Sequence, residues 1–150
     1  MKTRAAIIVG VLVIIDQLTK ISAVTYLKLH ESRVVVKDIF YLTLVRNSGA
    51  AFGFFRQKAA VFIFISIVTI LLILFYTKRF QYEYRYGRAG LTLILAGAVG
   101  NLIDRIRLGH VVDFLDFRIW PVFNFADIFI SLGGVLLIYH LLGVKRNIRS

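Results

Sequence analysis

Two aspartates in the C-terminal third of the chain could carry out acid–base chemistry. Asp113 and Asp127 lie in the stretch "VVDFLDFRIWPVFNFADIFI", residues 111–130, among Val, Phe, Ile, Leu and Trp. Two neighbouring carboxylates in surroundings of low dielectric constant do not both ionise readily and tend to share a proton. One can then act as a base toward water while the other acts as an acid. The third aspartate of the stretch, Asp116, is interpreted as a solvated residue near Arg118.

Further polar residues interrupt an apolar run near the N-terminus. Asp16 and Lys20 are four residues apart, so on a helix they share a face and can form an ion pair. We interpret this pair either as a bridge that holds the helix against its neighbours or as support for a reactive site nearby.

A second polar group follows helical spacing between residues 97 and 105. Gly97, Asn101, Asp104 and Arg105 fall on one side of a helix, and the small residues around Gly97 permit close contact with another helix. One interpretation is packing with an Asp104–Arg105 pair. The other is that Asn101 and Arg105 direct hydrogen-bond donors into a cavity. Asp104 is also the main rival of Asp113 as a catalytic acid.

Asn124 and Asp127 are three residues apart and therefore share one face of the last apolar segment. If that segment begins at Val122, Asp127 lies five residues into it, or roughly 7–8 Å at about 1.5 Å per residue. At that depth we expect water to reach the carboxylate from outside.

The composition requires a solvent other than water for much of the chain. Of the 150 residues, 59 % are hydrophobic and 18 % are charged, and the mean hydropathy is +0.78. A domain of this length cannot bury so many apolar side chains in one core, which indicates a membrane protein. The net charge of +11 is interpreted as attraction to anionic lipid headgroups and not to nucleic acid, because most basic residues flank apolar runs.

The sequence predicts chemistry without a metal or a cofactor. There is no cysteine, and His30, His110 and His140 show no spacing typical of metal ligands, so we expect them at interfacial or exposed positions. No phosphate-binding loop or dinucleotide fingerprint occurs. A serine–lysine hydrolase is disfavoured because no lysine can be matched to Ser48, Ser66 or Ser131 on the outer side.

Four apolar segments are long enough to cross a bilayer, and they predict one membrane-embedded domain over 1–150. A cleavable signal peptide is disfavoured for the first segment because it contains Asp16 and Lys20. Lysine and arginine are denser in the tails and the 78–88 connection, which predicts that both termini are cytoplasmic. The predicted spans are approximately 5–26, 59–77, 89–106 and 122–144.

The connections on the opposite side have their own patterns. Residues 34–46, "VVVKDIFYLTLVR", are β-branched and aromatic and predict a short strand or hairpin. The segment "NSGAAFGFF", residues 47–55, predicts a loop that leads into an interfacial segment.

Five motifs in order make the chain resemble lipoprotein signal peptidases (signal peptidase II), which remove signal peptides from bacterial prolipoproteins. Any one of the motifs alone would be weak. Their number and order across nearly the whole chain are specific. The motifs are "DQLTK" (16–20), "NSGAAF" (47–52), "GNLIDR" (100–105), "VVDF" (111–114) and "FNFAD" (123–127).

The resemblance implies four transmembrane helices, a small extracytoplasmic β-cradle and a short interfacial helix. It implies a metal-independent aspartyl pair, Asp113 and Asp127, that cleaves just before a diacylglyceryl-modified cysteine. It also implies a bacterial inner-membrane protein that contacts lipids and prolipoproteins, with its active site at the outer leaflet, and we expect a monomer. Substrate-binding positions by motif are Asn47, Asn101, Arg105 and Asn124, and supporting ones are Asp16, Lys20, Gly97 and Asp104.

Two other classes of function remain open from the residues. Intramembrane Asp, Asn, Arg and Lys also occur in small transporters and proton channels, but here they gather toward one side and form no chain across the membrane. A non-catalytic protein that binds a lipid or a signal helix would need a groove but no reactive pair.

Overall fold

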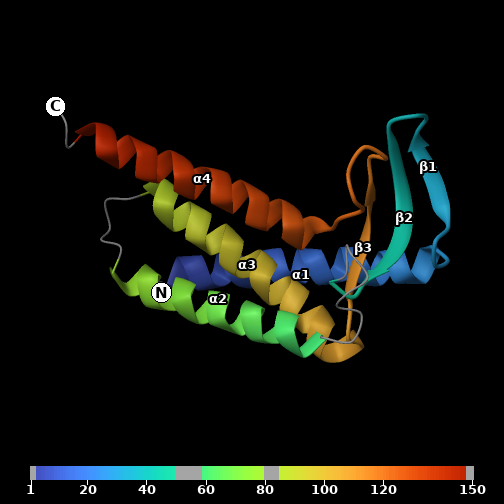
Figure 1. Ribbon diagram of the computed structural model, residues 1–150, viewed down its shortest axis with the longest axis horizontal. Coiled ribbons are helices and arrows are strands. Elements are labelled where there is room, and N and C mark those ends of the chain that lie inside the picture. Colours follow the sequence, from blue (N-terminus) through green and yellow to red (C-terminus); the bar gives the residue numbers. More distant parts are fainter. Residues whose placement is uncertain (1–2, 50–58, 80–84, 148–150) are drawn as a thin grey trace.

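Four long helices and a three-stranded sheet make up the computed structural model, which describes residues 3–49, 59–79 and 85–147 (Figure 1). The sheet and the helix ends nearest to it form one end of the molecule. The first turn of α1 and the last turn of α4 lie at the other end (Figure 1). In chain order the elements are α1 (Thr3–Tyr26), β1 (Ser32–Val36), β2 (Phe40–Asn47), α2 (Ala59–Arg79), α3 (Arg85–Leu108), β3 (Val111–Asp116) and α4 (Phe125–Asn147).

The outer faces of the helices are apolar. Large hydrophobic side chains such as Ile14, Phe64 and Val135 are exposed, which is the pattern of a protein whose solvent is lipid. Within the part of the chain that the structure describes, three helices, α1, α3 and α4, are long and apolar enough to span a membrane. The apolar part of α2, Ala60–Tyr76, is slightly shorter.

Helix α3 lies at the centre of the bundle and packs against the other three helices. Its contact with α4 depends on small residues, as expected for helices in lipid. A Cβ atom on Gly90 would approach the carbonyl oxygen of Gly133 to 2.6 Å, and one on Gly97 would overlap the carbonyl oxygen of Ala126. The sequence prediction of close helix contact at Gly97 is confirmed.

The sheet has the order β1-β2-β3, and both pairs of strands are antiparallel. Strands β1 and β2 form the hairpin that the 34–46 pattern predicts. Strand β3 was not predicted, because "VVDFLD" has no alternation of polar and apolar residues. The structure explains this pattern, since every residue of β3 is buried.

The chain between β3 and α4 folds back onto β3 and so places the start of α4. The backbone N–H groups of Phe114 and Leu115 donate to the carbonyl oxygen of Phe123 at 3.0 and 2.8 Å, and the N–H of Phe123 donates to Leu115 at 3.0 Å. These bonds hold Asn124, which precedes the first residue of α4, beside the strand that carries Asp113.

Several sequence predictions differ from the structure. Helix α4 begins at Phe125 and not at 122, so Asp127 lies in its first turn instead of five residues deep. His140 is buried, with a relative exposure of 9 %, and packs at Gly87 of α3, whereas an interfacial or exposed position was predicted. The predicted interfacial segment falls mostly within 50–58, which lies outside the described residues.

Candidate active site

Asp113 occupies the middle of β3 and is almost completely buried. Its residue is 1 % exposed, and Val45 of β2 lies opposite it in the sheet. Both carboxylate oxygens accept hydrogen bonds from amide side chains. Asn124 Nδ2 donates to Oδ1 at 2.6 Å, and Asn47 Nδ2 donates to Oδ2 at 2.8 Å. Residues from three separate segments therefore meet at this carboxylate.

Asp127 belongs to a reciprocal cap at the start of α4. The backbone N–H of Asp127 donates to Asn124 Oδ1 at 3.0 Å, and the N–H of Asn124 donates to Asp127 Oδ2 at 3.2 Å. This is the pattern of a capping box, in which two side chains satisfy backbone donors of the first turn. The positive end of the helix dipole favours a negative charge there.

Asn101 of α3 connects the second aspartate to the interior of the bundle. Its Nδ2 donates to Asp127 Oδ1 at 2.8 Å. Its Oδ1 accepts from Lys20 Nζ at 2.9 Å and from Asn124 Nδ2 at 3.2 Å. Asn124 therefore contacts both Asp113 and Asn101, and the two carboxylates are joined through a continuous network of amides. The predicted pair is brought together in space.

A buried ion-pair triad lies behind this network. Lys20 Nζ is 2.9 Å from Asp16 Oδ2 and 2.9 Å from Asp104 Oδ2. The pairing of Asp16 with Lys20 is as predicted, whereas the partner of Asp104 is Lys20 and not the neighbouring arginine considered from the sequence. Asp16 also accepts the N–H of Ala126 at 2.9 Å, which joins α1 to the first turn of α4.

Asp104 is fully engaged in structural contacts. Its Oδ2 accepts the backbone N–H of Val112 at 3.1 Å, next to Asp113 in β3. Its Oδ1 accepts from Gln17 Nε2 at 3.0 Å. Sequence reasoning missed Gln17, although a polar residue beside Asp16 in an apolar segment was a usable signal. These bonds favour an anchoring role for Asp104 over a catalytic one.

Arg105 is half-buried beside the pair. Its Nη1 donates to the carbonyl oxygen of Asn101 at 3.4 Å, and its guanidinium lies 5.6 Å from the centre of the Phe62 ring. Its positive charge interacts with those of Asp113 and Asp127. A guanidinium has five N–H donors, so Arg105 can hydrogen-bond a ligand at the pair while it keeps this contact.

Burial dominates the electrostatics of Asp113. It raises the pKa of that carboxyl from 3.8 to about 6, and the nearby charge of Asp127 acts in the same direction. Hydrogen bonds from Asn47 and Asn124 oppose the rise, as does the charge of Lys20. A carboxyl with a pKa in this range can hold a proton close to neutral pH, which is useful for acid–base catalysis.

Asp116, at the end of the same strand, was predicted to be solvated. The structure shows it buried, with a relative exposure of 5 %. Its Oδ2 accepts from Thr43 Oγ1 at 2.7 Å, and its Oδ1 accepts from the backbone N–H of Arg118 at 2.8 Å. Strand β2 has one extra residue between Leu42 and Val45, and Thr43 lies within this bulge. The expected nearness to Arg118 is confirmed, at 3.5 Å.

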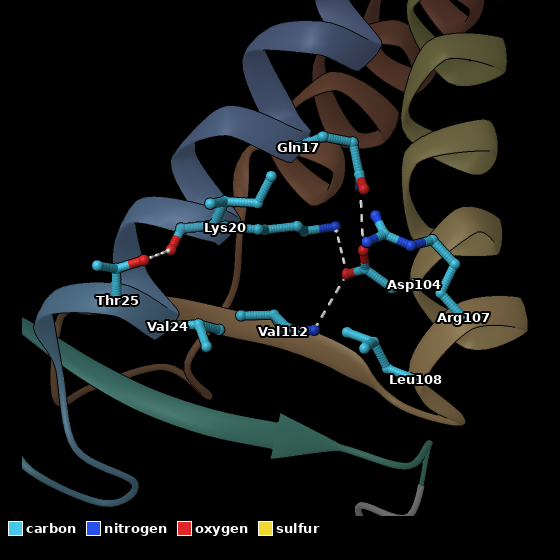
Figure 2. Close-up of a pocket in the computed structure, with 9 residues that line it drawn as sticks. Gln17, Lys20, Val24, Thr25, Asp104, Arg107, Leu108 and Val112 are labelled. Atoms are coloured by element: carbon cyan, nitrogen blue, oxygen red, sulfur yellow. Dashed lines mark hydrogen bonds and ion pairs between the residues drawn. The ribbon is translucent and has the colours of Figure 1, made fainter.

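A separate cavity of about 200 Å³ opens between α1 and α3 (Figure 2). It reaches Lys20 and Asp104 but is lined by neither Asp113 nor Asp127. In Figure 2 the side chains of Gln17, Lys20 and Arg107 lie around Asp104. The cavity therefore adjoins the ion-pair triad and not the two aspartates.

Comparison with known proteins places the chain in a family. The signal peptidase II family profile matches residues 8–143. The lipoprotein signal peptidase of Halothermothrix orenii is 47 % identical over 90 % of this chain and 92 % of its own. That of Moorella thermoacetica is 45 % identical over 85 % of each chain.

A solved structure of a bacterial membrane enzyme superposes with a TM-score of 0.88 at 35 % identity and covers 96 % of this chain and 90 % of its own. A second solved bacterial membrane enzyme gives 0.86 at 35 % identity and covers 93 % of this chain and 92 % of its own. With its ordered motifs, its helical bundle and the two aspartates joined by asparagines, the chain belongs to the signal peptidase II family.

Proposed function

We propose that the chain is an aspartic endopeptidase that removes the signal peptide of diacylglyceryl-modified prolipoproteins just before the lipidated cysteine. The observation that carries this proposal is the convergence of Asp113 and Asp127, from a strand and a helix, on one network of asparagine amides. The relatives named lipoprotein signal peptidase share most of the chain. A transporter or a non-catalytic binding protein has no need of such a pair.

The two aspartates have different roles in this proposal. Asp127, at the positive end of α4, is the ionised base that takes a proton from water. That water attacks the carbonyl carbon of the residue before the lipidated cysteine. Asp113 is the acid that hydrogen-bonds the carbonyl oxygen and delivers a proton to the leaving amine. Its burial and its pKa of about 6 support this assignment.

The polar side chains around the pair position the substrate and the acids. Asn101 and Asn124 hold the carboxylates through their amides. Arg105 supplies donors to the peptide backbone, and Asn47, which is exposed at the end of β2, contacts the substrate from the sheet side. Positioning of this kind contributes to rate by holding the reacting atoms in line.

We infer the arrangement in the membrane from the lengths of the helices and from the position of the aspartyl pair in the bundle. Helix α2 has 21 residues, or about 30 Å at about 1.5 Å per residue, which suffices for a fourth span. The pair lies at the end of the bundle that carries the sheet. We place that end at the outer leaflet of the bacterial inner membrane, where a lipidated cysteine is anchored, and both termini in the cytoplasm. One chain supplies both aspartates, so a monomer is sufficient.

A cleavage assay with purified protein in detergent tests the proposal. The probe is a synthetic peptide with a diacylglyceryl-modified cysteine after a signal sequence, and mass spectrometry locates the cut. We expect cleavage before the modified cysteine, none of the unlipidated peptide, and no effect of the chelator EDTA. Intact lipidated peptide after incubation with folded protein would contradict the proposal. Loss of activity with EDTA would contradict the metal-independent mechanism.

A further inference from the structure

We propose that Lys20 is a positioning residue of the aspartyl pair: its ammonium group fixes the Asn101 amide with its NH₂ toward Asp127 and so holds that carboxylate in one orientation. The inference rests on the proposed function and adds a residue that does not touch the reacting atoms. Lys20 lies on α1, whereas the two aspartates lie on β3 and α4.

The chemistry of the ammonium group decides the orientation of the amide. A lysine ammonium can only donate hydrogen bonds, so the Asn101 atom that faces it at 2.9 Å is Oδ1. Because the amide is planar, its Nδ2 then points the other way, where it donates to Asp127 Oδ1 at 2.8 Å. This bond fixes the position of Asp127 Oδ1.

The ammonium group is itself held in place. Its three donors have three acceptors, Asp16 Oδ2, Asp104 Oδ2 and Asn101 Oδ1, each at 2.9 Å. The residue is 2 % exposed. Lys20 therefore cannot turn away from Asn101 without leaving two carboxylates buried and unpaired, which is costly. The triad is a rigid support for one amide orientation.

Removal of Lys20 leaves a weaker constraint on that amide. The remaining bond to Asn101 Oδ1 comes from Asn124 Nδ2 at 3.2 Å. If the amide turns over, its oxygen faces Asp127 Oδ1, so two acceptors oppose each other and the carboxylate loses its fixed orientation. The positive charge of Lys20 also lowers the pKa of Asp113, so that pKa rises when Lys20 is removed. Other charged groups around the pair are Arg105 and Asp104 of α3 and Asp16 of α1.

The cavity beside the triad makes a direct experiment possible. Lys20 and Asp104 line it, together with apolar residues such as Val24 and Leu108 (Figure 2). In a Lys20→Ala variant the missing atoms beyond Cβ correspond to propylammonium. A small ammonium ion that enters the cavity can therefore occupy the position of the lost group.

The experiment measures kcat/KM for the lipidated peptide against pH in the wild type and in Lys20→Ala. We expect Lys20→Ala to lower kcat/KM by about 10- to 100-fold, the loss typical of a hydrogen bond to a charged group. The limb of the profile that reports Asp113 should move to higher pH, because the Lys20 charge lowers the pKa of that carboxyl. Propylammonium should restore both, and 1-propanol should not. Arg107→Gln, which changes another cavity residue, should keep the wild-type profile.

Three results would overturn the inference. They are an unmoved Asp113 limb, equal rescue by 1-propanol, and no rescue of a folded variant by propylammonium. If Lys20→Ala does not fold, the double variant Lys20→Met/Asp104→Asn removes one charge of each sign and keeps the net charge of the triad. The limb of its profile that reports Asp113 must also move to higher pH. Absence of cleavage by the wild type would refute the proposed function instead, so the two failures are distinct.

Discussion

Replacement of Asp113 by asparagine should inactivate the protein and make it more stable at neutral pH. The pKa of Asp113 is raised by burial from its ordinary value of 3.8 to about 6. A carboxyl whose pKa is higher in the folded state destabilises the fold once the pH exceeds the pKa that the carboxyl has in the unfolded chain. The penalty is absent below about pH 3.8, grows up to about pH 6, and is constant above that pH.

The size of this penalty follows from the same values. The difference between 3.8 and about 6, at about 1.36 kcal/mol per pH unit, corresponds to roughly 3 kcal/mol. An asparagine at position 113 has no charge, but its NH₂ group faces one of the two amide NH₂ groups that donate to Asp113. The Asn47 amide must then turn away, and its lost hydrogen bond costs about 1 kcal/mol. The net gain is about 2 kcal/mol at pH 7.5. For a chain of this length that raises the Tm by about 4–8 °C.

Thermal unfolding in detergent between pH 4 and pH 8 measures the effect. Asp113→Asn should unfold at a higher temperature than the wild type at pH 7.5, and the difference should vanish or change sign near pH 4. A Tm that is lower than that of the wild type at every pH would refute the reasoning, because Asp113 would then stabilise the fold as a charge.

Asp116→Asn is the matched control on the same strand. Burial acts to raise the pKa of Asp116, but hydrogen bonds from Thr43 and the Arg118 N–H, with the Arg118 charge, lower it below its ordinary value. Such a group stabilises the fold above the pKa of the unfolded chain, and this stability is lost as the pH falls through the folded pKa. Asp116→Asn should therefore be less stable than the wild type at pH 7.5, with a smaller difference in acid.

The remaining predictions concern packing and one donor. Gly97→Ala should lower the free energy of unfolding by about 1–3 kcal/mol, because its Cβ would overlap the Ala126 carbonyl oxygen. Gly134→Ala, whose Cβ would meet nothing within 4 Å, should not lower it; equal losses in chemical denaturation would contradict this. Asn47→Ala removes a donor that lowers the pKa of Asp113, so the pH at which Asp113 titrates should rise; an unchanged pH dependence of stability would contradict that contact.

The sequence predicted the four helices, the β1–β2 hairpin and the local contacts around the site, but strand β3 was not predicted from its pattern. Helical spacing was sufficient to pair Asp16 with Lys20 and to place Asn124 beside Asp127, because these contacts are local. Asp113 could be proposed as a partner of Asp127 from the motifs. Its strand was missed because a wholly buried strand has no alternating pattern.

Contacts across the fold were beyond the sequence for a physical reason. The bond from Thr43 to Asp116 depends on how β2 pairs with β3, and the pairing of Lys20 with Asp104 depends on how α1 packs against α3. Neither is encoded in local spacing. The start of α4 at Phe125 is set by the cap at Asn124 and by the return of Phe123 to β3, so the apolar residues before it do not belong to the helix.

The most direct test of the account compares single asparagine variants in the cleavage assay with the lipidated peptide. Asp113→Asn and Asp127→Asn should each reduce turnover by about 10²–10⁴-fold while both proteins remain folded in detergent. Asp104→Asn, which changes a residue of the buried triad, should lose less turnover than either of these two variants. Near-normal turnover by either Asp113→Asn or Asp127→Asn would contradict the central claim that these two carboxyl groups carry out the reaction.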